Sequence, residues 1–150
     1  MVDLNISIFD YACKVAGARI KQKQNYNSSK PFSSNYELVG VLGEIVYGYW
    51  HNELFDSRLT THGDKGFDFS KRVQVKSSEK YKARHLIEYM DKDFSKFDYY
   101  VLVTVDIQRM EGEVYGWISV EEFKEKAEVV DFGYGERLAV PLNVLHEIKN

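Results

Sequence analysis

Two side chains of complementary chemistry alternate along the short segment Val73-Gln74-Val75-Lys76. Residues two apart on a strand point to the same face of a sheet. Both valines can therefore enter a core while the amide oxygen of Gln74 and the ammonium group of Lys76 project together on the other side. Asp68 lies a few residues earlier, on a segment expected to form the neighbouring strand about 4.8 Å away. Asp68 and Gln74 can then share one metal ion, with Lys76 beside it.

This set of groups suits the hydrolysis of a phosphodiester bond. Oxygen donors favour a hard cation, Mg²⁺ or Mn²⁺, which neutralises phosphate charge and lowers the pKa of an attacking water. The candidate ligands are the carboxylate of Asp68, the side-chain carbonyl of Gln74 and the main-chain carbonyl of Val75. Lys76 would orient or deprotonate the water, or stabilise charge on the pentavalent phosphate.

A glutamate on an otherwise apolar helix adds a second carboxylate. Good N-cap residue types predict a helix from Ser34 or Asn35 to about Trp50, and Glu44 lies within it. A carboxylate on such a helix needs a partner, because an unpaired buried charge is costly. Glu44 is therefore a candidate ligand, directly or through a metal-bound water. The apolar face of this helix is expected to consist of Leu38, Val41, Leu42, Ile45, Val46 and Tyr49.

Two glycines on the same helix, Gly40 and Gly43, lie one turn apart. They remove side chains from one surface and so predict that another part of the backbone comes close there, at a cost in helix propensity.

The remaining periodicities predict one α/β domain, a sandwich with a mixed central sheet flanked by helices. N-terminal helices are expected within residues 1–52, a motif-bearing sheet core within 54–106, and a C-terminal strand-helix-strand extension within 113–150. The expected helices are Leu4 to about Gln24, Tyr81–Asp93 and Val120–Glu128, the last capped by Ser119, and the expected strands are Phe67–Phe69, Arg72–Ser77, Asp98–Val105, Glu113–Ser119 and Arg137–Val140.

The strings GDKGFDF and RVQVKSS, preceded by the helix ELVGVLGEIVYGYW, resemble the core of the PD-(D/E)XK nuclease superfamily. The likeness is closer to its QXK branch, the Mrr-like restriction endonucleases, and DYYVLVTVD is similar to the next core strand of that family. Residue by residue, Asp68 matches the metal aspartate, Lys76 the catalytic lysine and Glu44 the helix glutamate. Gln74 stands where most members carry Asp or Glu, which removes one negative charge from the site.

The resemblance covers about Tyr36 to Asp106 and implies a restriction-endonuclease-like fold with a Mg²⁺-dependent or Mn²⁺-dependent nuclease activity on DNA. Members of this kind often cut both strands as dimers, so a homodimer or a protein partner is left open. The alternatives are an inactive module of the same fold that binds DNA or protein, and a subunit of a larger repair, recombination or restriction assembly.

Charge is unevenly distributed along the chain. The net charge is −3, yet residues 1–84 hold 13 basic and 9 acidic residues and residues 85–150 hold 7 and 14. The half that contains the motifs is thus the basic half, and phosphate binding would use such patches. A solvated surface is the alternative. The residues expected to contact nucleic acid are Lys71, Arg72, Ser77, Ser78, Lys80, Lys82 and Arg84.

Several other classes are disfavoured by composition. Cys13 is the one cysteine, so neither an internal disulfide nor a cysteine-based zinc site is expected. No apolar run approaches the roughly 20 residues that span a bilayer, and the N-terminus lacks a basic segment typical of a secretory signal. The expected location is cytoplasmic, without a membrane partner. The four histidines show no metal-binding spacing.

Overall fold

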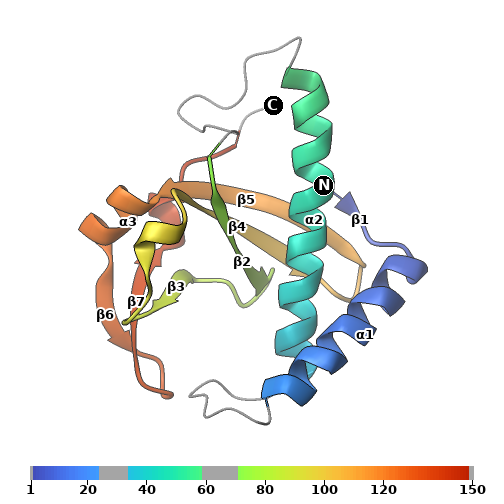
Figure 1. Ribbon diagram of the computed structural model, residues 1–150, viewed down its shortest axis with the longest axis horizontal. Coiled ribbons are helices and arrows are strands. Elements are labelled where there is room, and N and C mark those ends of the chain that lie inside the picture. The colour runs from blue at the N-terminus through green and yellow to red at the C-terminus, as the bar shows by residue number, and fades with distance from the viewer. Residues whose placement is uncertain (1, 24–33, 59–70, 149–150) are drawn as a thin grey trace.

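The computed structural model of the chain describes residues 2–23, 34–58 and 71–148. The expected strand at Phe67–Phe69 and the candidate ligand Asp68 lie outside these ranges. The chain is an α/β protein (Figure 1), and its elements in order are β1 (Val2–Asp3), α1 (Ile6–Lys23), α2 (Ser34–Arg58), β2 (Val73–Glu79), β3 (His85–Tyr89), β4 (Tyr99–Asp106), β5 (Glu111–Ser119), α3 (Val120–Lys126), β6 (Glu128–Asp131) and β7 (Glu136–Pro141), with 3₁₀ turns at Phe94–Lys96 and Leu142–Val144.

The main sheet has the strand order β1-β5-β4-β2 and is mixed, as the sequence predicts. β2 runs parallel to β4, whereas β5 is antiparallel to both β4 and β1. The strand that carries the Gln-x-Lys motif therefore lies beside the most apolar strand of the chain. Within the described residues, β2 forms one border of this sheet.

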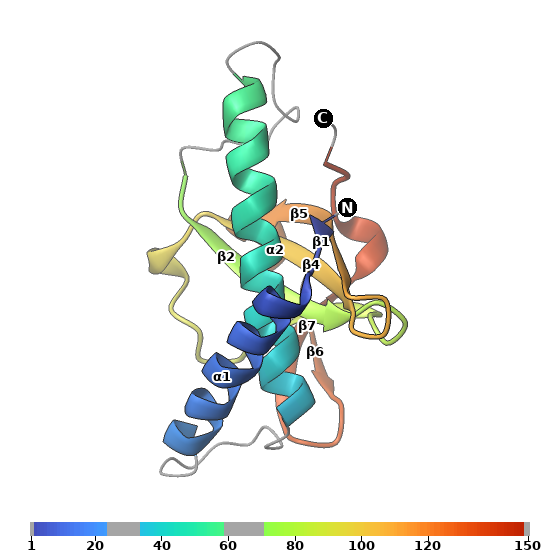
Figure 2. The same cartoon turned by 90° about the vertical axis from the view of Figure 1, so that its right-hand side faces the viewer.

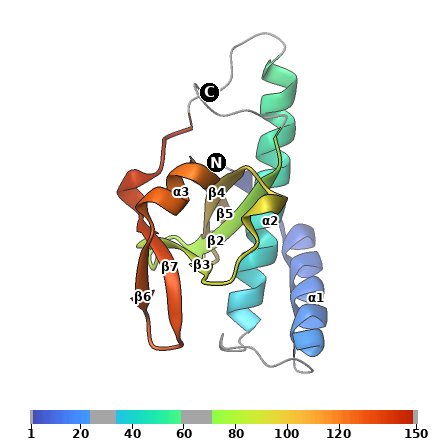
Figure 3. The ribbon, with the colours of Figure 1, turned by 60° about the vertical axis from the view of Figure 1, so that its left-hand side comes forward.

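A second, antiparallel sheet has the order β3-β7-β6, with β3 on its border. Figure 3 shows the main sheet between two layers: α1 and α2 on one side, and the second sheet with α3 on the other. Figure 2 shows α2 crossing the face of the main sheet behind α1. The expected helical flanks are thus correct for one face, while a second sheet covers much of the other.

Two hydrophobic clusters fill the spaces between these layers. The first joins α1 and α2 to one face of the main sheet through residues such as Ala12, Leu42, Val46, Val101 and Val103. The second lies between the main sheet, the second sheet and α3, and its buried members are Leu86, Phe97, Tyr100, Leu102, Ile118, Val120, Phe123 and Val140. Because β4 contributes to both clusters, its continuous apolar sequence is explained by burial on both faces.

The predicted close approach to α2 occurs at Gly43. A Cβ atom placed there would overlap Oγ of Ser77 and lie 2.6 Å from Cβ of Ser77 on β2, whereas a Cβ at Gly40 would meet nothing within 4 Å. Gly43 thus lets α2 pack directly against the motif strand.

Alanine at these two glycines should have opposite effects on stability. We expect Gly43→Ala to destabilise the fold by about 1–3 kcal/mol, because the new methyl group must displace Ser77 and β2. The matched variant Gly40→Ala should stabilise it by about 0.5–1 kcal/mol through helix propensity. Urea unfolding of both variants measures the difference. Equal effects would show that α2 does not rest on β2 at Gly43.

Four expectations are corrected. Residues Tyr81–Asp93 are not helical: they contain β3, whose side chains alternate in burial and whose backbone pairs with β7. α2 continues to Arg58, so the N-terminal helical part extends past residue 52. The expected C-terminal strand-helix-strand part contains one more strand, because Glu128–Asp131 forms β6, and its first strand, β5, pairs with β4 in the main sheet. Tyr49, expected on the apolar face of α2, is 49% exposed.

Candidate active site

A cleft of about 580 Å³ opens between the border strand of each sheet and one side of α2. β2 contributes residues from Gln74 to Glu79, and β3 contributes residues from His85 to Tyr89. The remaining lining residues are Glu37, Val39, Gly40, Glu44, Lys82, Leu102, Tyr134 and Arg137. Three of the four residues expected to act in catalysis, Glu44, Gln74 and Lys76, therefore lie on one cleft.

The expected alternation of side chains along β2 explains why Gln74 and Lys76 both line the cleft. Val73 and Val75 pack against the first hydrophobic cluster, beneath α2. Gln74 lies in register with Tyr100 and Lys76 with Leu102, two residues of the second cluster. The side chains of Gln74 and Lys76 thus face β3 and the second sheet, whereas Ser77 faces α2 at Gly43, and Val75 also borders the cleft.

Glu44 reaches the cleft from the exposed side of α2. Its two carboxylate oxygens accept hydrogen bonds from Arg19 of α1, at 3.3 and 3.2 Å. This hydrogen bond raises the pKa of Arg19 above its ordinary value, since it outweighs the opposing effect of burial. Both side chains are well exposed, so the pair adds no more than about 1 kcal/mol to stability. The expectation that Glu44 is a buried charge in need of a partner is therefore wrong: its side chain is 54% exposed, and Arg19 pairs with it at the surface.

Lys76 contacts a carboxylate that the sequence does not single out. Its Nζ lies 3.1 Å from Oε1 of Glu88, whose side chain is fully buried while that of Lys76 is 19% exposed. Glu88 also accepts hydrogen bonds of 2.8 Å from the hydroxyl of Tyr100 and from the amide of Tyr89. Lys92 approaches its second oxygen at 3.8 Å. β2, β3 and β4 thus meet at one charged network on the floor of the cleft.

The electrostatics of this network keep Glu88 ionised. Burial alone would raise the pKa of Glu88, but the charge of Lys76 and the hydrogen bonds from Tyr89 and Tyr100 outweigh burial and lower it. Burial, followed by the charge of Glu88 and the hydrogen bond to it, raises the pKa of Tyr100, which remains a hydrogen-bond donor. A fixed negative charge at 3.1 Å favours the protonated form of Lys76. Lys76 is therefore suited to stabilise anionic charge.

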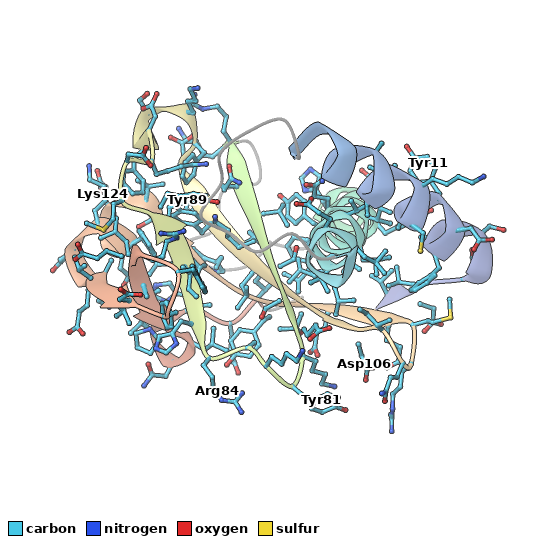
Figure 4. All side chains as sticks on the ribbon, turned by 90° about the horizontal axis from the view of Figure 1, so that it is seen from below. Tyr11, Tyr81, Arg84, Tyr89, Asp106 and Lys124 are labelled. Carbon is cyan, nitrogen blue, oxygen red and sulfur yellow. The ribbon has the colours of Figure 1, made fainter. Side chains whose placement is uncertain are left out.

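The residues expected to contact nucleic acid divide into two groups. Ser77, Ser78 and Lys82 line the cleft, and Lys82 forms an ion pair of 2.8 Å with Glu79. The lining does not include Lys71, Arg72, Lys80 or Arg84. Figure 4 shows Arg84 and Tyr81 apart from each other along the connection between β2 and β3.

Arg72 has a structural contact of its own. Its main-chain amide and its Nε approach one carboxylate oxygen of Asp98 at 3.2 and 3.5 Å, and its guanidinium donates to the carbonyl of Ser95 at 3.0 Å. These contacts tie the start of β2 to the segment that precedes β4.

The oxygen donors of the cleft fit a hard cation such as Mg²⁺, which takes carboxylate, carbonyl and water ligands. Within residues 2–23, 34–58 and 71–148, however, no group of three or more His, Cys, Asp or Glu side chains is arranged to hold a metal ion. The candidate set there consists of Glu44 and Gln74, and its expected aspartate, Asp68, lies outside the described residues.

A second groove, of about 440 Å³, lies between α1 and α2. Its lining carries no charged side chain and consists of Ser7, Ile8, Tyr11, Ile45, Gly48, Tyr49 and Asn52. It therefore lacks the groups that phosphate chemistry needs.

Comparisons with known proteins return no match: no family model, curated protein or solved structure is similar to this chain. Among the described helices, none is long and apolar enough to cross a membrane.

Proposed function

We propose that the protein is a Mg²⁺-dependent nuclease of the PD-(D/E)XK type, which hydrolyses phosphodiester bonds of DNA. The observation that carries the proposal is the meeting of Glu44, Gln74 and Lys76 on one cleft, although they come from α2 and β2 and lie up to 32 positions apart. A sequence match to the Gln-x-Lys motif requires only the short spacing between Gln74 and Lys76 along β2. The position of the helix glutamate on the lining of the same cleft is the further feature that supports an active site.

The arrangement of elements supports a restriction-endonuclease-like fold in this proposal. The glutamate helix packs on the Gln-x-Lys strand through Gly43, and that strand pairs in parallel with Tyr99–Asp106, the segment similar to the next core strand of the family. Helix, motif strand and following strand are therefore neighbours in space in the order that the resemblance requires.

Each residue then has a distinct task. When bound, Mg²⁺ supplies charge neutralisation at the phosphate and an activated water. Asp68, Gln74 and the main-chain carbonyl of Val75 would hold the ion, and Glu44 would join them by releasing Arg19. Lys76, held by Glu88, would stabilise the negative charge that develops on the phosphate oxygens.

The alternative is an inactive module of the same fold that binds DNA or a protein partner. Two features favour it: Gln74 contributes no charge to a metal ion, and the ammonium of Lys76 is already engaged by Glu88. The two functions differ in one property: the enzyme cleaves the DNA that it binds, whereas the inactive module only binds it.

A cleavage assay separates them. Linear, nicked, branched and single-stranded DNA would be incubated with the protein in Mg²⁺, in Mn²⁺ and in EDTA. The proposal predicts cleavage of at least one substrate with either ion and none in EDTA. Retention of DNA without cleavage under every condition would support the binding module instead.

A further inference from the structure

The lining of the cleft also includes an arginine whose guanidinium lies over two aromatic rings. The guanidinium carbon of Arg137 on β7 lies 4.7 Å from the ring centre of Tyr89 and 5.1 Å from that of Tyr134. Tyr89 ends β3, in register with Arg137, and Tyr134 lies in the turn between β6 and β7. All three residues line the same cleft as Lys76. Figure 4 shows Tyr89 on the half of the molecule remote from Tyr11 of α1.

This arginine is fixed in place more firmly than a surface side chain. Arg137 is only 5% exposed, and its guanidinium donates a hydrogen bond of 2.9 Å to the carbonyl of Glu136. Gly135, at a φ of +108°, leaves room for the guanidinium, because a Cβ there would lie 3.1 Å from one of its nitrogens. A guanidinium fixed by aromatic stacking loses little freedom when it binds an anion, and its planar fork matches a phosphate group.

The size of the cleft limits what it can receive. About 580 Å³ lies within the range of pockets that hold one small ligand, roughly 300–1,000 Å³. A space of this volume holds about one or two nucleotides of a strand. In a paired duplex the base faces are stacked on one another, so aromatic side chains contact them only where the strand is unpaired.

We propose that Tyr89, Tyr134 and Arg137 form a subsite for an unpaired strand of DNA. That the ligand is DNA rests on the proposed nuclease function. Arg137 binds a phosphate next to the one that faces Lys76. The tyrosine rings contact the adjoining base and sugar. The preferred substrate of the cleft is then a single-stranded region or a frayed end, and the arrangement selects it over intact duplex.

Binding without cleavage tests the subsite separately from the chemistry. Fluorescence anisotropy in EDTA would measure the affinity of the full chain for a labelled single strand of about 12 nucleotides, a common site size, and for the same sequence as a duplex. We expect the wild type to bind the single strand more tightly. Arg137→Gln and Tyr134→Leu should each weaken single-strand binding about tenfold or more, and Tyr134→Phe, which keeps the ring, should bind as wild type.

The salt dependence of binding and a control variant add to this test. Loss of one phosphate contact in Arg137→Gln should reduce the slope of log affinity against log salt by about 0.7. Arg109→Gln, which changes an exposed arginine in the turn between β4 and β5, is the matched control and should bind as wild type. Thermal melting checks each variant, and if Arg137→Gln does not fold, Tyr134→Leu, with its expected loss of about tenfold or more in single-strand binding, decides the test.

The outcomes distinguish this inference from the proposed function. Cleavage that depends on metal and on Lys76, together with single-strand binding unaffected by Arg137→Gln and Tyr134→Leu, would overturn the subsite and leave the nuclease intact. Single-strand binding that needs these residues, without cleavage under any condition, would keep the subsite and refute the enzyme. Failure of the wild type to bind the single strand, or tighter binding to duplex, would also overturn the subsite.

Discussion

Replacing Lys76 with alanine should lower kcat for DNA cleavage by at least about 100-fold, the usual effect of removing one preorganised group that stabilises transition-state charge. Lys76 lies on the cleft with its ammonium fixed 3.1 Å from Glu88, so its charge is in place before substrate binds. The effect should fall on kcat more than on KM, because the charge that Lys76 meets develops during the reaction. Steady-state kinetics with Mg²⁺ measure both constants.

The matched control is Lys124→Ala. Lys124 is an exposed lysine on α3, outside the cleft, and should be replaceable with little change in either constant. Lys76→Ala also leaves the buried carboxylate of Glu88 without the cation that pairs with it, so it should lower stability as well, and thermal melting checks that the protein remains folded. A folded Lys76→Ala protein that cleaves DNA at the wild-type rate would remove Lys76 from the mechanism.

Replacing Glu88 with alanine should destabilise the fold by about 3–5 kcal/mol, which is typical when one partner of a buried ion pair is removed. Glu88 is fully buried and joins Lys76, Tyr100 and the amide of Tyr89. Its loss leaves the ammonium of Lys76 and the hydroxyl of Tyr100 without this acceptor. Urea unfolding at pH 7 measures the change. The matched variant Glu88→Gln keeps the shape and an acceptor oxygen and should cost less.

The contribution of Glu88 should also depend on pH. Its pKa in the folded protein lies below its ordinary value of 4.5, which holds for the unfolded chain. The stabilisation is therefore fully present above about pH 4.5, and it is lost as the pH falls through the lower folded pKa. The stability gap between wild type and Glu88→Gln should narrow as the pH is lowered from 7 toward 3. A gap that widens on acidification would mean that Glu88 is not held ionised by Lys76.

Much of the candidate site follows from local patterns in the sequence. The alternation of valine with Gln74 and Lys76 predicts a strand with one polar face, and the structure confirms it. Glu44 is recognisable as a carboxylate within a mostly apolar helix. The glycines indicate a close approach less well, because Gly43 meets Ser77 of β2 whereas Gly40 meets nothing within 4 Å. These signals are short in range and depend on the period of one element.

β3 could not be predicted from local patterns, and the reason is Glu88, the residue that pairs with Lys76. Leu86 and Glu88 both point into the protein from this strand. A glutamate in a buried position breaks the apolar alternation by which a strand is identified, so the segment is read as a helix. Its strand conformation comes from pairing with β7, about 50 residues later in the chain. Local rules fail most readily where a buried charge serves a site.

The subsite of Arg137 has no sequence signal either. Tyr89 and Arg137 are separated by 48 positions, and they become neighbours only through the register of β3 with β7. Arg137 lies far from the basic clusters of the first half of the chain. Composition therefore points to Lys71, Lys80 and Arg84, which lie outside the cleft lining, and overlooks an arginine within it.

The proposed nuclease activity is tested by comparing metal-dependent cleavage by the wild type with cleavage by Asp68→Asn. Asparagine keeps the shape of Asp68 and removes the charge that a Mg²⁺ ion needs most, since Gln74 is neutral. We predict that the wild type cuts single-stranded or frayed DNA in Mg²⁺ and that Asp68→Asn, although folded, does not. Equal cleavage by both proteins, or cleavage that persists in EDTA, would contradict the account.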